Sequence, residues 1–135
     1  MNSRYLKIPR GILISGILMI LMGLFNIFNI LRFAIFNPNL SFGWDDFLIS
    51  RGIGLILHIL TIVSGIGILK FKNWSRIVAI VVFIILGIIH MLILLDCLTS
   101  NSFDFWSLSV SIQLFISVCL IIFFTHSSTR SIFKR

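Results

Sequence analysis

Charged residues are scarce in this sequence. Only 11% of its 135 residues are Asp, Glu, Lys or Arg, whereas 59% are hydrophobic and the mean hydropathy is +1.14. A soluble domain carries roughly 25% charged residues, so a water-facing surface cannot be assembled from this composition. The sequence therefore excludes a soluble globular domain, and it predicts one unit of ordinary domain size whose solvent is lipid.

Acidic residues, cysteines and catalytic motifs are equally sparse. None of the four acidic residues lies in the middle of an apolar run, which argues against a proton-coupled exporter built on an embedded carboxylate. Cys97 and Cys119 fit neither a C-x-x-C motif nor a metal-type spacing. No G-x-S-x-G, H-E-x-x-H or P-loop pattern occurs. We therefore predict no catalytic residues and no metal site, and favour a protein that is not an enzyme.

What the sequence does contain is four apolar runs of 19–23 residues, at about 11–31, 47–69, 77–95 and 105–125. A helix needs about 20 such residues to cross the ~30 Å hydrocarbon core. Helices are the conformation that satisfies the backbone of runs this long in lipid. Short connections make successive helices antiparallel neighbours. The prediction is an all-α polytopic membrane protein, an up-down four-transmembrane-helix bundle in one membrane domain, with a short basic tail at 126–135.

The cations are distributed unevenly between the two ends of these runs. Nine of the eleven lie at the N-terminus, in the second connection or in the tail, and only Arg32 and Arg51 lie at the opposite end, with all four acids. The positive-inside rule then predicts that both termini are cytoplasmic. This distribution explains the net charge of +7 without a nucleic-acid partner, which we do not expect. The nine cations are Arg4, Lys7, Arg10, Lys70, Lys72, Arg76, Arg130, Lys134 and Arg135, and the acids are Asp45, Asp46, Asp96 and Asp104.

The tryptophans agree with this orientation. Trp74 falls at the inner boundary, and Trp44 and Trp106 fall at the outer one. Indoles prefer the headgroup level of a bilayer. The basic residues of the tail should lie against anionic headgroups, where each contributes about 1 kcal/mol.

Polar side chains inside the apolar runs recur at intervals of three or four residues, so that each run carries one polar stripe. Such side chains tend to face the interior of a bundle, and here most of them lie in the outer half of the membrane. They could line a ligand-binding region open to the outer face, or they could join the helices through hydrogen bonds of ~0.6–2 kcal/mol. Both interpretations stay open. The candidate ligand-binding residues are Asn26, Asn29, Arg51, His58, His90 and Gln113.

Small residues share these stripes and are predicted to pack helix against helix. Gly54, Thr61 and Gly65 follow one face of the second run, and Gly87 lies in the third. Small residues at such intervals let membrane helices approach closely. The same surfaces could serve a homo-oligomer or another membrane subunit.

Two histidines on neighbouring runs invite comparison with a b-type haem site. His58 lies 11 residues below the outer end of its run and His90 about 5 below its own. This is a depth mismatch of about 9 Å, which argues against two axial ligands of one iron. We therefore expect no cofactor.

The stretch GIGILKFKNWSRIVAIVV, residues 65–82, resembles a pattern in uncharacterised small bacterial four-helix integral membrane proteins, where a glycine-containing helix ends in L-K-x-K-x-W-[AS]-R. The chain is also similar to DoxX-like proteins in size and number of spans, without a diagnostic DoxX motif. The resemblance covers 18 residues and implies a multi-pass protein of the bacterial inner membrane. It brings no catalytic residues to this chain.

Two functions are compatible with these observations. The leading hypothesis is a non-enzymatic subunit, assembly factor or partner-binding module, because glycine-rich helix surfaces occur without a catalytic constellation. The alternative is binding or transport of a small molecule, lipid or quinone through the polar region in the outer half of the bundle.

Overall fold

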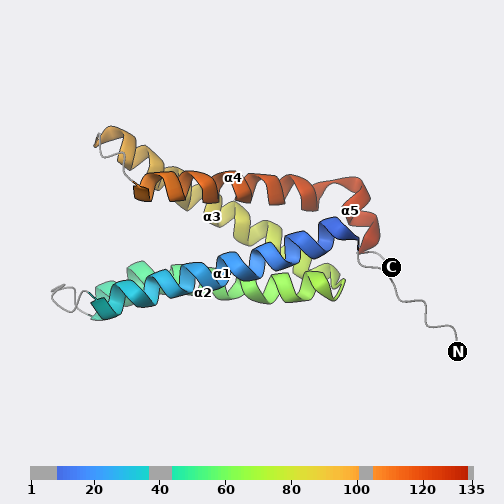
Figure 1. Ribbon diagram of the computed structural model, residues 1–135, viewed down its shortest axis with the longest axis horizontal. Coiled ribbons are helices and arrows are strands. Elements are labelled where there is room, and N and C mark those ends of the chain that lie inside the picture. Colours follow the sequence, from blue (N-terminus) through green and yellow to red (C-terminus); the bar gives the residue numbers. More distant parts are fainter. Residues whose placement is uncertain (1–8, 37–43, 101–104, 134–135) are drawn as a thin grey trace, which may run out of the picture. The chain divides into compact units, whose positions relative to one another are not determined.

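The computed structural model describes residues 9–36, 44–100 and 105–133 (Figure 1). This part of the chain is helical almost throughout and contains no strand. Its four long helices are each apolar and long enough to cross a membrane, which confirms the predicted all-helical class with four candidate spans. The helices are α1 (Arg10–Phe36), α2 (Trp44–Leu69), α3 (Asn73–Thr99), α4 (Phe105–Thr125) and the short α5 (Ser127–Ile132).

Two compact units divide the chain, the first ending at Ser75 and the second beginning at Arg76. The first holds α1, α2 and the beginning of α3, and the second holds the rest of α3 with α4 and α5.

α3 begins at Asn73, four residues before the predicted start of the third span. The backbone N–H and the hydroxyl of Ser75 both donate to the carbonyl of Lys72, which closes the first turn. An apolar run marks only the part of a helix that needs lipid, whereas the hydrogen-bond ladder can continue through the headgroup layer. The basic connection is therefore a three-residue turn followed by the first turn of a helix.

In the first unit α1 and α2 pack as an antiparallel hairpin whose backbones touch at glycines (Figure 1). A Cβ on Gly65 would lie 2.9 Å from the carbonyl oxygen of Gly16, and a Cβ on Gly16 would lie 3.2 Å from that of Gly65. Further along, a Cβ on Gly23 would lie 2.9 Å from the carbonyl oxygen of His58. No other residue type permits this separation, so glycine sets the register of the hairpin.

Small hydroxyl side chains are buried on both sides of this glycine contact. The Ser15 hydroxyl donates to the carbonyl of Ile12 (3.1 Å) and the Thr61 hydroxyl to that of Leu57 (2.8 Å). Bonding to the preceding turn of its own helix satisfies each hydroxyl without a partner across the interface. Ser64 is also fully buried, and its Oγ has no hydrogen-bond partner in the described residues.

The turn between α2 and α3 is a Schellman motif with an aromatic residue in the position that usually holds glycine. The N–H of Lys72 donates to the carbonyl of Gly67 (2.9 Å), and the N–H of Phe71 donates to that of Ile68 (3.0 Å). Phe71 has a φ of 54°, in the left-handed region. Gly67 is required for a different reason, since a Cβ there would meet the Cβ of Ser75 at 2.5 Å.

This conformation reverses the usual ranking of alanine and glycine at one position. Phe71→Ala and Phe71→Gly both remove the half-buried ring, but only glycine accepts the left-handed φ without a Cβ penalty. We expect the Gly variant to be the more stable of the two by about 1 kcal/mol. Reversible unfolding in detergent micelles measures this difference. An Ala variant at least as stable as the Gly variant would contradict the conformation of this turn.

In the second unit α3 and α4 are also antiparallel, but their backbones lie further apart. The Arg76 guanidinium donates from Nη1 to the carbonyl of Phe124 (3.1 Å), so the beginning of α3 lies beside the end of α4. Further along, a Cβ on Gly87 would meet only the Leu114 side chain, at 3.9 Å. Ordinary side-chain contacts therefore join this pair, where the α1–α2 pair has a backbone contact.

The segment that follows α4 is not a plain tail. His126 caps the short helix α5, its Nδ1 accepting from the backbone N–H of Ser128 (3.4 Å). Thr129 and Phe133 are buried, whereas Arg130 is exposed. The predicted basic tail thus contains a short helix that buries Thr129 and is followed by the buried C-cap residue Phe133.

Candidate functional site

The six predicted ligand-binding residues fall in two different units. Asn26, Asn29, Arg51 and His58 belong to the α1–α2 unit, and two lie on α3 and α4 in the other. That all six line one region stays a prediction.

In the first unit the four candidates share the half of the hairpin that lies away from the turn at Phe71. The register of the hairpin places Gly23 level with His58, and Ile30 level with Gly54, whose Cβ would meet the Ile30 side chain at 3.8 Å. Asn26 and Asn29 are therefore level with the segment of α2 that begins at Arg51 and ends at His58.

All four of these side chains are half-buried, in contrast to the buried serines and threonine nearer the other end of the hairpin. The side-chain amide of Asn26 donates to the carbonyl of Met22 in its own helix (3.0 Å). The first unit thus has a close-packed end built on glycine and a more polar end, which is the arrangement that a ligand region or a polar helix contact would need.

In the second unit His90 is the notable side chain. It is only 8% exposed, and its Nδ1 has no hydrogen-bond partner in the part of the chain that the structure describes. On α4 the hydroxyls of Ser111 and Ser117 donate to the carbonyls of Ser107 and Gln113 in the same helix (2.8 Å each). Those serines are satisfied locally. A buried polar group without a hydrogen-bond partner costs about 1–3 kcal/mol. The Nδ1 of His90 therefore has a hydrogen bond still to gain.

The predicted packing residues differ in how close the neighbouring helix lies to each of them. Gly65 touches the backbone of α1, and Thr61 is 1% exposed beside it. Gly54 and Gly87 have only ordinary van der Waals neighbours. Sequence reasoning overlooked Gly23, which touches α2 as closely as Gly65 touches α1. Its interval of seven residues from Gly16 was the signal that could have found it.

No group of three or more His, Cys, Asp or Glu in the described residues could hold a metal ion. Cys97 is half-buried and Cys119 exposed, and both are free thiols. His58 and His90 lie in different units.

Several of the charged residues near the helix ends lie in the described part of the chain. Asp96 is exposed at the end of α3, and Trp74 is 50% exposed at the beginning of the same helix. Asp45 and Asp46 lie in the first turn of α2. The charged residues that lie outside the described part of the chain are Arg4, Lys7, Asp104, Lys134 and Arg135. The side of the membrane on which each end lies stays a prediction.

Comparison with known proteins finds no family model, no curated protein and no solved structure that matches this chain. The assignment therefore depends on the helices themselves. Four helices of this length and hydropathy are those of a multi-pass membrane protein.

Proposed function

We propose that this chain is a non-enzymatic membrane subunit, in which α1 and α2 form a self-contained anchor and α3 and α4 bind a transmembrane segment of another protein. The unequal packing of the two helix pairs carries this proposal. Backbone-to-backbone glycine contacts join α1 to α2, whereas Gly87 meets only a side chain of α4. Close packing and interhelical hydrogen bonds drive helix association in lipid, so the less closely packed pair has more to gain from a partner.

His90 supports the same assignment. Polar groups within the hydrocarbon layer are costly and tend to find partners on neighbouring helices. The Nδ1 of His90 has none in the described chain. A partner helix that offers a hydroxyl, amide or carbonyl at this depth would satisfy it, with a gain of about 0.6–2 kcal/mol.

Site-specific photo-cross-linking in the expressing cell tests this proposal. A benzophenone side chain placed at Ile89 or Leu94, both half-buried on either side of His90, should yield discrete protein adducts. The control position is Phe28, a 63% exposed residue of α1, where only lipid adducts are expected. If positions 89 and 94 give lipid adducts alone, and native purification gives only monomer, the proposal is wrong.

A second candidate function is binding or transport of a small molecule, lipid or quinone. The four half-buried polar residues at one end of the α1–α2 hairpin favour it. Such a site needs access for the ligand, and polar side chains that are not fully enclosed provide one.

Cysteine labelling distinguishes this candidate from a simple polar helix contact. With Cys97→Ser and Cys119→Ser as background, Asn29→Cys should react with a water-soluble maleimide, and added ligand should slow the reaction. Arg32→Cys, three residues further along α1 and exposed, is the positive control. Labelling at position 32 without labelling at position 29 would reject an accessible site.

A further inference from the structure

One end of the α1–α2 hairpin carries three exposed cations beside an exposed indole. Arg10, Lys70 and Lys72 are exposed, and Trp74 is 50% exposed. These four residues, here named the basic end, all belong to the first unit. Their association therefore does not depend on the placement of the second unit.

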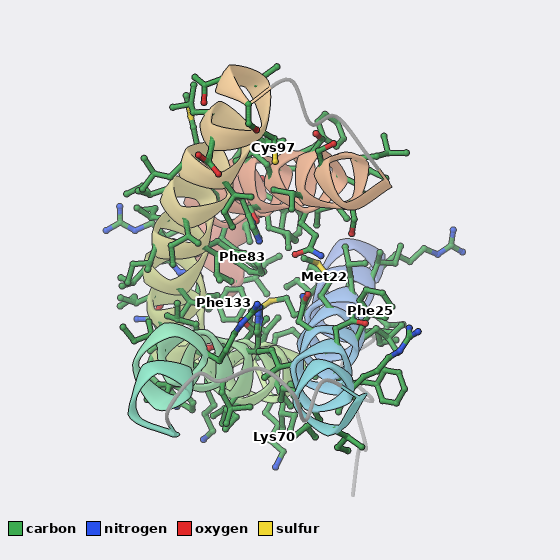
Figure 2. The ribbon with its side chains drawn as sticks, turned by 90° about the vertical axis from the view of Figure 1, so that its left-hand side faces the viewer. Met22, Phe25, Lys70, Phe83, Cys97 and Phe133 are labelled. Atoms are coloured by element: carbon green, nitrogen blue, oxygen red, sulfur yellow. The ribbon has the colours of Figure 1, made fainter. Side chains whose placement is uncertain are left out.

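The register of the hairpin brings the four together. A Cβ on Gly16 would lie 3.2 Å from the carbonyl oxygen of Gly65, which places these two residues level with one another. Arg10 lies six residues before Gly16, about 9 Å further along the axis. Lys70 and Lys72 lie five and seven residues after Gly65, towards the same end of the hairpin as Arg10. Figure 1 shows the beginning of α1 and the end of α2 at the same end of the hairpin, and Figure 2 shows Lys70 pointing away from the ribbon.

The geometry of the turn keeps both lysine side chains available. The N–H groups of residues 71 and 72 are committed to carbonyls of α2, and Phe71 between them is half-buried. Lys70 and Lys72 therefore extend from a turn that is held by its own backbone. In the described part of the chain no carboxylate forms an ion pair with either lysine or with Arg10.

The depth of the basic end indicates what it can bind. The candidate span Arg51–Leu69 ends one residue before Lys70, and the span that starts α1 begins at Arg10 itself. The cations therefore lie where the hydrocarbon layer gives way to the headgroups, the level that indoles such as that of Trp74 also prefer. The anion present at this level is the phosphate of a phospholipid.

We propose that the basic end binds the phosphate headgroup of an anionic phospholipid, of the phosphatidylglycerol or cardiolipin class. Clusters of Lys and Arg beside membrane helices bind anionic headgroups with about 1 kcal/mol for each cation. That corresponds to roughly a fivefold change in local lipid occupancy for each lysine. This proposal is independent of the partner proposed for α3 and α4.

Fluorescence quenching of Trp74 by brominated lipids tests the proposal in the full chain. Trp44→Phe and Trp106→Phe leave Trp74 as the one indole. The protein is reconstituted in phosphatidylcholine vesicles with a minor fraction of phosphatidylglycerol, and either lipid carries the bromine. We expect brominated phosphatidylglycerol to quench Trp74 several-fold more than its share of the bilayer predicts, and high salt to reduce this excess.

Matched substitutions locate the effect. Lys70→Gln and Lys72→Gln should each lower the excess about fivefold, whereas Lys70→Arg should keep it. Arg32→Gln, which removes an exposed cation at the opposite end of the same hairpin, should leave it unchanged.

Several outcomes would overturn the proposal. Equal quenching by the two lipids, salt-independent quenching, or an equal loss in the Arg32→Gln variant would each do so. An acidic protein retained on purification, with no lipid preference in the vesicles, would also reject it in favour of a protein partner. Should a Gln variant fail to insert, the comparison of the two lipids and the salt titration on the parent chain still decide.

Discussion

Gly65→Val is expected to destabilise the α1–α2 hairpin by about 2–3 kcal/mol, the upper part of the range for overpacked interiors. Even the first added carbon would lie 2.9 Å from the carbonyl oxygen of Gly16 and 3.2 Å from the Cβ of Met19. The first of these neighbours is backbone and cannot rotate away. The two helices would have to separate, and much of the packing between α1 and α2 around Thr61 would be lost.

Gly52→Val is the matched control. Gly52 lies on the same helix, yet nothing is found within 4 Å of a Cβ placed there. The same chemical change should therefore alter stability by less than about 0.5 kcal/mol. Unfolding in mixed micelles compares the two variants with the parent. Equal destabilisation of the two variants would exclude the glycine contact with α1 as the cause, since valine is a better helix former than glycine.

Arg76→Met is expected to destabilise the second unit by about 2 kcal/mol. Arg76 donates to the carbonyl of Phe124 in the last turn of α4, where four carbonyls lack a partner within the helix. A hydrogen bond from a charged donor contributes about 1.5–3 kcal/mol. The cation also lies beside the negative end of the dipole of α4, and this electrostatic interaction stabilises the contact further.

Lys72→Met is the control for this effect. Lys72 is an exposed cation four residues earlier in the chain. In neutral detergent its replacement should change stability by less than about 0.5 kcal/mol. Unfolding transitions of both variants in the same detergent provide the measurement. Similar transitions for the two would show that Arg76 acts only through its charge.

The helices themselves could be predicted from the sequence because lipid imposes a simple rule. A run such as 77–95 has no charge and is long enough to span the hydrocarbon layer. A helix is the conformation that pairs all of its backbone N–H and C=O groups there. The start of α3 at Asn73 could not be predicted in the same way. A helix that continues beyond the membrane boundary shows no change in hydropathy there.

The contacts between the helices are harder to predict from the sequence. Residues at intervals of three and four fixed which face of α2 carries Thr61 and Gly65, but they did not identify the face that meets them. Gly16 and Gly23 supply that face. Their interval of seven residues is a signal in the sequence, but the pairing of the two helices shows that they meet Gly65 and His58. The predicted ligand region required in addition that four helices be placed together. The sequence contains no signal for that step.

Labelling of single cysteines from the two sides of the membrane tests the predicted topology. In this prediction four helices span the membrane, with both termini and the turn between α2 and α3 on the cytoplasmic side. With Cys97→Ser and Cys119→Ser as background, the positions are Asn73→Cys, Ser100→Cys and Ser131→Cys, each replacing an exposed residue.

In intact cells a membrane-impermeant maleimide is expected to label position 100 only. Positions 73 and 131 should react after the membrane is permeabilised, because the nine cations near them favour the cytoplasmic side. Labelling of positions 73 and 100 from the same side would contradict the account, since α3 could not then cross the membrane.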